Sequence, residues 1–303
     1  MTLGCSRKVA QIAFIPEETD DLWEPAHIAA ANVARAKGLD VYWNGPTRMH
    51  DFQRQILLLD HAIEKGAQAI LLAPAQPLAL VSPVQRAVSR GLPVVVLGSP
   101  LPLPASGMLS YVLNDEEEGG RIAARHLGER MRGKGEVVVL GLHPGVPSLF
   151  VRLRSFEDVL AAEFPRIKIV SVQMGSNDEA QAEQTAREVL RSKPHVNAIL
   201  ALSYLATVGA FHALRDEQNR TVLLVGCDQR YDLLYYVSLG IIDALIAENT
   251  YEMGERGMEI AIAGKRPDGA ALVIKIKPLL ITRENMYAPH LARVLIHEWE
   301  PTP

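Results

Sequence analysis

The sequence is poor in cysteine and has no long apolar run. Its 303 residues include two cysteines, Cys5 and Cys227, which are too few for a disulfide framework. No apolar run approaches the ~20 residues that a membrane-spanning helix needs. The 31 basic and 35 acidic residues are interspersed, without a basic block or arm. Nucleic acid is therefore not an expected partner.

Motifs for catalysis and for metal binding are also missing. The sequence has no Gly-x-Ser-x-Gly elbow, no Gly-Lys-Ser/Thr phosphate loop and no His-Glu-x-x-His. Its nine histidines do not recur at metal-ligand spacing, and Cys-x-x-Cys is absent. We therefore expect no enzyme activity, no cofactor and no metal site. An α/β enzyme without a known motif stays open as an alternative, and it would need a nucleophile and a base within reach of each other.

Strands and helices are expected to alternate along the chain, in two halves separated by the Pro-rich loop 99–110. Alternation of this kind indicates an α/β fold with parallel sheets of right-handed βαβ units. At about 150 residues per domain, the length indicates two similar lobes. The expected strands are 9–15, 39–44, 67–73, 92–98, 110–113, 135–141, 167–173, 197–202, 222–225 and 240–249. The expected helices are 24–37, 51–65, 77–90, 117–131, 148–163, 178–192, 204–216 and 251–264.

Polar residues follow the expected strands, where ligands bind in open α/β sheets. Asp228 is the sharpest example, because it follows the apolar run 222–225 almost directly. A carboxylate there could catalyse, hold a metal or bind a ligand. The residues after the other strands are rich in hydrogen-bonding groups and poor in nucleophile–base pairs, so the pattern favours binding.

Four segments together resemble a known family: "YVLNDEEEGGRIAARHL", "GLPVVVLGS", "NAILALSYLATVGAFHALRDEQNRTVLLVGCD" and "PLLITRENM". They look like the periplasmic sugar-binding proteins of ABC importers and the ligand-binding cores of the lac repressor family. The resemblance runs from about Val9 to Met286. It implies two Rossmann-like lobes, 9–113 plus 249–278 and 114–248 plus 279–303. Three hinge crossovers, near 112–115, 247–250 and 276–280, would let the lobes close on a ligand.

In the first lobe, the resemblance places Glu17, Asp21, Trp23 and Glu24 on the ligand-contacting loop. A flat aromatic suits a sugar ring, which offers an apolar face and a polar rim. Trp23 could equally be the first core residue of the following helix. Asn114 falls at the first hinge, where it would contact the ligand or cap the next helix.

In the second lobe, "RLRSF" (152–156) resembles the family pattern of Arg, two residues, Gly and Phe, with Ser155 in place of Gly. This implies that Arg152 donates to sugar hydroxyls, since a guanidinium fork satisfies two acceptors at once. The alternative is that Arg152 is a solvated helix charge. Arg154 is the nearby arginine that we expect not to bind.

Asp228 matches the family's ligand carboxylate, and Glu248 stands where the family commonly has a polar contact. Ser203-Tyr204 replaces a frequent Asn-Asp pair, which keeps Ser203 as a candidate ligand contact. Gly98-Ser99 and Ala73-Pro74 likewise depart from Asp-Arg and Asn-Pro. These changes put a standard monosaccharide in doubt. The acidic residues favour a neutral polyol or a ligand with a positive group over an anion.

The resulting expectation is a solute-binding protein of an ABC importer that binds a sugar or polyol. Its partner would be an ABC permease, its location the periplasm or cell envelope, and its state a monomer. "TLGCSRK" is similar to the end of a lipoprotein signal, so Cys5 would carry a lipid anchor, unless the segment is an arbitrary tail. The alternative function is a stand-alone regulatory core that dimerises. The helix-turn-helix module of the DNA-binding members is not expected, because the first strand starts at Val9.

Overall fold

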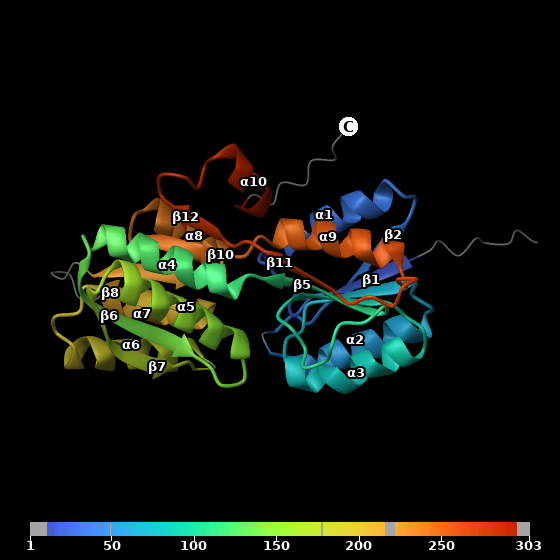
Figure 1. The fold of residues 1–303 in the computed structure, drawn as a ribbon, viewed down its shortest axis with the longest axis horizontal. Helices are drawn as coiled ribbons and strands as arrows, with labels where there is room; N and C mark the ends of the chain where they lie inside the picture. The colour runs from blue at the N-terminus through green and yellow to red at the C-terminus, as the bar shows by residue number, and fades with distance from the viewer. Residues whose placement is uncertain (1–10, 49, 177, 216–221, 296–303) are drawn as a thin grey trace, which may run out of the picture. The chain divides into compact units, whose positions relative to one another are not determined.

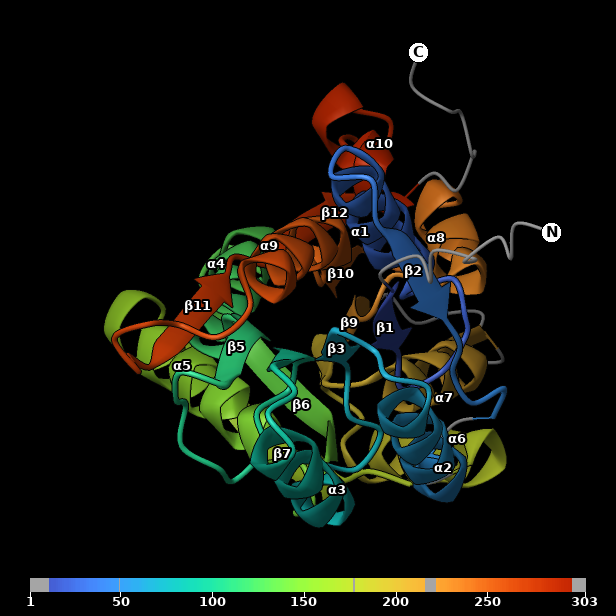
Figure 2. The same cartoon turned by 90° about the vertical axis from the view of Figure 1, so that its right-hand side faces the viewer.

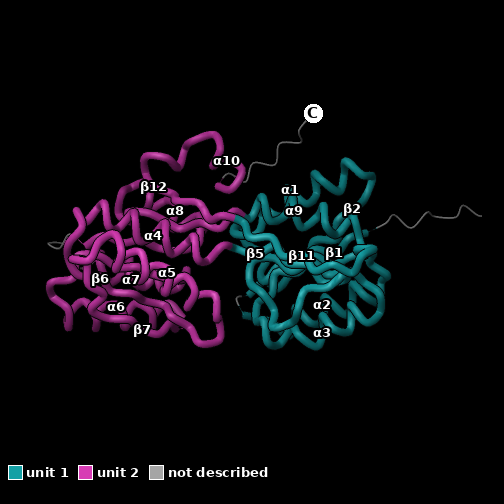
Figure 3. The backbone as a smooth tube through the Cα atoms, in the orientation of Figure 1, with its two compact units in different colours: residues 1–114, 250–276, 296–303 teal, residues 115–249, 277–295 magenta. Residues whose placement is uncertain are grey.

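The computed structural model describes residues 11–48, 50–176, 178–215 and 222–295. The described residues form two compact units, coloured separately in Figure 3: unit 1 lies within 11–114 and 250–276, and unit 2 lies within 115–249 and 277–295. The chain therefore passes between the units after Asn114, after Asn249 and after Ile276. The sequence-based lobe boundaries, after residues 113, 248 and 278, stay a prediction.

Unit 1 is built on a six-stranded parallel sheet with the order β11-β5-β4-β3-β1-β2. Its central strands are continuous apolar runs, such as "AILL" and "VVVLG", because a parallel sheet is covered on both faces. The strands are β1 (Gln11–Ile15), β2 (Asp40–Trp43), β3 (Ala69–Leu72), β4 (Val94–Gly98), β5 (Leu109–Asn114) and β11 (Leu272–Ile276).

Helices cover both faces of this sheet (Figures 1 and 2). On one face lie α1 (Glu24–Arg35) and α9 (Thr250–Ala263), and on the other lie α2 (Phe52–Glu64) and α3 (Pro77–Ser89). Ile12 and Phe14 pack with α1, whereas Ala13 and Ile15 pack with α2 and α3. The alternation follows from the strand geometry, which points successive side chains to opposite faces.

Unit 2 repeats the design with the strand order β12-β10-β9-β8-β6-β7, in which only β12 runs antiparallel among the described pairings. Its strands are β6 (Lys134–Leu142), β7 (Arg166–Met174), β8 (Ala198–Ala201), β9 (Leu223–Cys227), β10 (Ala244–Ala247) and β12 (Leu279–Thr282). Its helices are α4 (Glu116–Arg130), α5 (Pro147–Glu163), α6 (Glu179–Ser192), α7 (Tyr204–Arg215), α8 (Tyr231–Ser238) and α10 (Pro289–Leu295).

Helices α4 and α5 approach each other closely at Gly120. A Cβ on Gly120 would lie 2.2 Å from the carbonyl oxygen of Arg152 and 2.9 Å from the backbone nitrogen of Phe156. Beside this crossing, the hydroxyl of Ser155 donates to the carbonyl oxygen of Glu117 at 2.6 Å. Ser155, which stands in place of the family glycine, therefore links α5 to the first turn of α4 by a hydrogen bond.

The structure confirms the expected α/β class and contains every helix and strand expected from the sequence, with ends shifted by up to four residues. Four elements were not expected: α8, α10, β11 and β12. Each is short or, as in β11 and β12, comes at the edge of a sheet, so its apolar pattern is brief. Within the described ranges, no helix combines the length and apolar character needed to cross a membrane.

Candidate functional site

Asp228 lies directly after β9, at the carboxyl edge of the unit 2 sheet, where β6, β8, β9 and β10 end. Its backbone has φ = 71°, a left-handed conformation that aspartate tolerates better than most residues. The backbone N–H of Tyr204 donates to its Oδ2 at 2.8 Å. Burial raises the pKa of the Asp228 carboxyl, and the nearby positive charges of Arg152 and Arg230 oppose that rise.

Arg152 is 3% exposed on α5 and reaches the same edge. Its Nε donates to Oε2 of Glu116 at 2.6 Å, and its Nη1 donates to the carbonyl oxygen of Leu202, just beyond β8, at 3.2 Å. Burial alone would lower the pKa of the guanidinium, but Cys227, Glu116 and Asp228 raise it well above its ordinary value. Arg152 is thus a buried, permanently charged group, whereas Arg154 is exposed.

The side chain of Gln229, the residue after Asp228, bonds to the backbone of Glu248. Gln229 is almost fully buried, its Nε2 donates to the carbonyl oxygen of Glu248 at 2.7 Å, and its Oε1 accepts from the backbone N–H of Glu248 at 3.0 Å. These two bonds continue the β9–β10 pairing beyond the strand ends. Gln229 was not singled out from the sequence, although an amide next to a strand-end aspartate is a usable signal.

Ser203 and Tyr204 begin α7 at the same edge. Oγ of Ser203 accepts from the backbone N–H of Ala206 at 3.4 Å, so this side chain acts as a helix cap. The Tyr204 hydroxyl donates to Oδ2 of Asp232 at 3.0 Å, and the guanidinium of Arg230 lies 4.5 Å from the centre of its ring. Burial and the Asp232 carboxylate raise the pKa of the Tyr204 phenol, which stays protonated.

In unit 1, the loop after β1 carries Glu17, Asp21 and Trp23. Trp23 is 2% exposed within the apolar core under α1, and its indole N–H donates to Oε1 of Glu17 at 2.9 Å. This geometry matches the core alternative for Trp23 and gives Glu17 a structural bond. Asp21 is half-buried. Stacking of Trp23 on a ligand stays a prediction, and its burial argues against it.

In unit 1, Gln55 bonds to the backbone of loops that follow the strands, as Gln229 does in unit 2. It is fully buried on α2, and its Nε2 donates to the carbonyl oxygens of Pro16 (2.8 Å) and Ala73 (2.7 Å). Its Oε1 accepts from the backbone N–H of Ala75 at 2.9 Å. The loops after β1 and β3 are therefore tied together. Gln55 belongs to the same buried series of α2 as Leu58, Leu59 and Ala62. A polar amide in an apolar series indicates a buried side chain that needs hydrogen-bond partners, and this was the signal in the sequence.

Asn114 is the last residue of β5 and is 5% exposed. The helix cap that was its alternative role belongs to the next residue, because Oδ1 of Asp115 accepts from the backbone N–H of Glu118 at 3.2 Å. A ligand contact by Asn114 stays a prediction. Cys5 lies outside the described residues.

Cys227, the last residue of β9, is an unreactive side chain at this edge. Burial raises the pKa of the Cys227 thiol to about 12, so it remains a neutral, packed side chain. In the part of the chain that the structure describes, no three His, Cys, Asp or Glu side chains are grouped so as to hold a metal ion. What gathers at the unit 2 edge is a set of fixed donors and acceptors.

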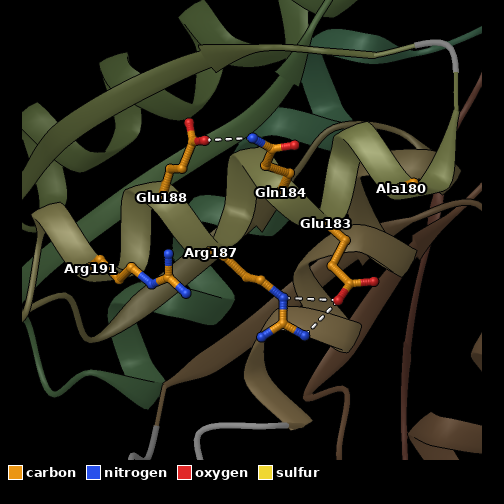
Figure 4. A pocket seen from close by; sticks show the side chains of 6 residues that line it. All are labelled: Ala180, Glu183, Gln184, Arg187, Glu188 and Arg191. Atoms are coloured by element: carbon orange, nitrogen blue, oxygen red, sulfur yellow. Dashed lines mark hydrogen bonds and ion pairs between the residues drawn. The ribbon is translucent and has the colours of Figure 1, made fainter.

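A hollow of about 440 Å³ lies on the surface of α6. All of its lining side chains come from that one helix, and several bond to each other, as Arg187 does to Glu183 and Gln184 does to Glu188 (Figure 4). None of the predicted site residues lines it. We therefore place the functional site at the strand ends and not in this hollow.

Comparison with known families decides what this arrangement is. The model of the periplasmic binding protein domain matches residues 12–264 of the chain. The chain belongs to this family. As a periplasmic binding protein it binds a solute and is not an enzyme, and the family assigns it to the periplasm.

Individual relatives agree with the family. The chain is 26% identical over 270 residues to a D-apiose import binding protein of Paraburkholderia graminis, covering 86% of this chain and 85% of that protein. It is 26% identical over 256 residues to a xylitol-binding protein of Mycolicibacterium smegmatis, covering 84% and 71%. An ABC transporter solute-binding protein of Agrobacterium vitis, solved with α-D-tagatopyranose, matches with a TM-score of 0.82 and 26% identity over 94% of this chain and 99% of that chain. The fold expected from the resemblance is thereby confirmed.

Proposed function

We propose that this periplasmic binding protein is the solute-binding component of an ABC importer and carries a sugar or sugar-like polyol. The observation that carries the proposal is that buried Arg152 and Asp228 lie at the same edge of unit 2, close enough for each to affect the pKa of the other. A guanidinium and a carboxylate at one edge offer several donors and two acceptor oxygens, which suits a hydroxyl-rich ligand. Relatives that are import binding proteins favour this role over the regulatory core.

The residues that would contact the ligand in unit 2 are Arg152, Asp228, Ser203 and Glu248. In unit 1 they are Glu17, Asp21 and Asn114, with Trp23 behind them. Gln229 and Gln55 hold the loops that bear several of these groups. We propose that they set the positions of the contacts and do not touch the ligand.

Isothermal titration calorimetry with a panel of D-apiose, D-ribose, D-allose, D-tagatose and xylitol tests the proposal. One of these ligands should bind saturably at one site per chain, and Asp228→Asn should weaken that binding. A protein that binds none of the panel, or whose best ligand is insensitive to Asp228→Asn and Arg152→Ala, is inconsistent with the assigned site.

The remaining parts of the proposal concern the setting in the cell. We propose an ABC permease as the partner, a monomer as the working state and a lipid anchor on Cys5. Labelling with a radioactive fatty acid, with Cys5→Ser as the control, tests the anchor, and sedimentation tests the monomer. The predicted hinge motion at the three chain passages would lower the radius of gyration on saturation with ligand.

A further inference from the structure

Glu116 and Arg152 form a buried ion pair between the first residue of α4 and the middle of α5. Their side chains are 11% and 3% exposed, and the pair is 2.6 Å long. A second ion pair, Arg125–Glu163, joins the same two helices at their other ends at 2.8 Å, but its side chains are 51% and 41% exposed. A buried arginine needs a compensating charge, whereas an exposed one is compensated by water. The buried charge of Arg152 therefore needs the Glu116 carboxylate, whereas water can compensate the charge of the exposed Arg125.

The fold holds Glu116 in this position from several directions. Gly120 permits the close approach of α4 to the backbone of Arg152, and Ser155 fastens the carbonyl of Glu117. Asp115 caps the helix immediately before Glu116. The amino end of α4 also favours a negative side chain there. Glu116 is thus aimed at the guanidinium by rigid elements.

Four of the charged groups at this edge act directly on one another. Two positive groups, Arg152 and Arg230, both act on Asp228, and two negative groups, Glu116 and Asp228, both act on Arg152. A carboxylate-bearing ligand would add a third negative charge to this set. Without Glu116, the same ligand would supply the charge that the buried arginine lacks.

We propose that Glu116 occupies the position in which Arg152 would otherwise receive a ligand carboxylate, so that unit 2 accepts uncharged ligands and rejects sugar acids. This inference rests on the proposed ligand role of Arg152. Glu116 would then determine ligand specificity by its charge, and α4 would contribute to the choice between neutral and acidic ligands.

The first experiment needs no sugar. Thermal unfolding of the parent, E116A and the matched control E163A is compared in sodium formate and in sodium chloride at equal ionic strength and neutral pH. Formate should raise the unfolding midpoint of E116A saturably, because it replaces the missing carboxylate beside Arg152. The parent and E163A should show no such difference. If E116A responds like the other two, Glu116 does not fill an anion position and the inference is wrong.

The second experiment uses E116Q, which keeps the side-chain shape and an acceptor for Arg152 if E116A fails to fold. Calorimetry compares D-galactose with D-galacturonate and D-glucose with D-glucuronate, pairs that differ by one carboxylate. The parent should prefer the neutral member of each pair or bind neither, and E116Q should shift the preference toward the acid by at least about tenfold, equal to about 1.4 kcal/mol. The E163Q variant should behave as the parent.

The outcomes separate this inference from the proposed function. If the parent binds no sugar but formate stabilises its E116A variant, the inference that Glu116 fills an anion position holds, and only the proposed sugar role is contradicted. A parent that binds the sugar panel, with no formate effect in E116A and no shift in E116Q, keeps the sugar role and overturns the inference. A parent that prefers the acids overturns it as well.

Discussion

The side-chain amide of Gln229 closes a two-bond ring with the backbone N–H and carbonyl of Glu248, at 3.0 and 2.7 Å. The two bonds fix the segment after β9 to the segment after β10. Asp228 is held with them, because Gln229 follows it directly. Asp228 is held further by the Tyr204 backbone N–H. Its left-handed backbone is therefore supported by the neighbouring Gln229 and by the bond that its own carboxylate accepts.

Replacing Gln229 by leucine should lower the free energy of unfolding by ~1–3 kcal/mol for each backbone group of Glu248 left unsatisfied. Ligand affinity should fall as well, because Asp228 and Glu248 lose their fixed positions. Urea unfolding and calorimetry measure the two effects.

Asn285 supplies the control. Its amide bonds the backbone N–H of Thr282 and the carbonyl of Leu280 in the same way, both at 2.8 Å, near the other end of β10. Asn285→Leu should therefore reduce stability without changing affinity. Equal affinity in both variants would show that Gln229 serves stability alone.

Arg152→Ala should weaken ligand binding by about 1.5–3 kcal/mol, the range for hydrogen bonds to charged groups. It should also lower stability, because the mostly buried Glu116 carboxylate loses its ion-pair partner. Arg154→Ala, at an exposed position of the same helix, should change neither quantity. Calorimetry and urea unfolding of both variants decide, and a larger effect on binding from Arg154 would contradict the assignment.

The affinity for ligand should decrease at acidic pH. The ionised Asp228 carboxylate accepts hydroxyl bonds more strongly than the protonated carboxyl does, and burial raises its pKa above the usual value of 3.8. Affinity should therefore begin to fall at a higher pH than an ordinary aspartate would allow. Asp228→Asn should bind more weakly at neutral pH and lose this pH dependence, which titration calorimetry over a pH series would detect.

The same shift has an opposite effect on stability. Because the folded-state pKa of Asp228 lies above the unfolded one, the ionised carboxylate costs stability at neutral pH, and the cost disappears as the pH falls through the folded pKa. Asp228→Asn should therefore unfold at a higher urea concentration than the parent at neutral pH, and this advantage should vanish in acid. A parent that is the more stable protein at neutral pH would contradict the sign.

The neighbouring glycines Gly119 and Gly120 should respond to alanine in opposite directions. A Cβ on Gly119 meets nothing closer than 3.6 Å, so Gly119→Ala should stabilise α4 by up to about 1 kcal/mol through helix propensity. A Cβ on Gly120 would lie 2.2 Å from the backbone of α5, and Gly120→Ala should cost about 1–3 kcal/mol or more. Urea unfolding compares them, and similar values for both would contradict the close approach of α4 and α5.

Trp23→Phe should retain ligand affinity and lose about 0.5–1.5 kcal/mol of stability with the hydrogen bond to Glu17. Trp23→Ala should cost about 3–5 kcal/mol, because it empties a buried position. Fluorescence titration and calorimetry on the folded variants test the ligand wall predicted from the sequence. If folded Trp23→Ala binds as tightly as the parent, Trp23 is a core residue alone.

The sequence by itself determined the alternation of strands and helices, the two-lobe class and the position of Asp228 at a strand end. These features follow from local periodicity and from turn residues such as Gly38, Gly66 and Gly91, whose positive φ ends the helices α1, α2 and α3. Short or edge elements such as α8 and β12 were missed, because their apolar patterns are too brief to separate from loops.

Tertiary structure decided which groups work together. Glu116 lies 36 residues before Arg152, and Gln55 lies 39 residues after the carbonyl of Pro16 that it binds. No local pattern encodes such pairs, since they depend on how helices cross and where strand ends meet. The burial of Trp23 was likewise open in the sequence, because an aromatic before a helix can face either a ligand or the core. Only the packing of α1 on its sheet placed it in the core.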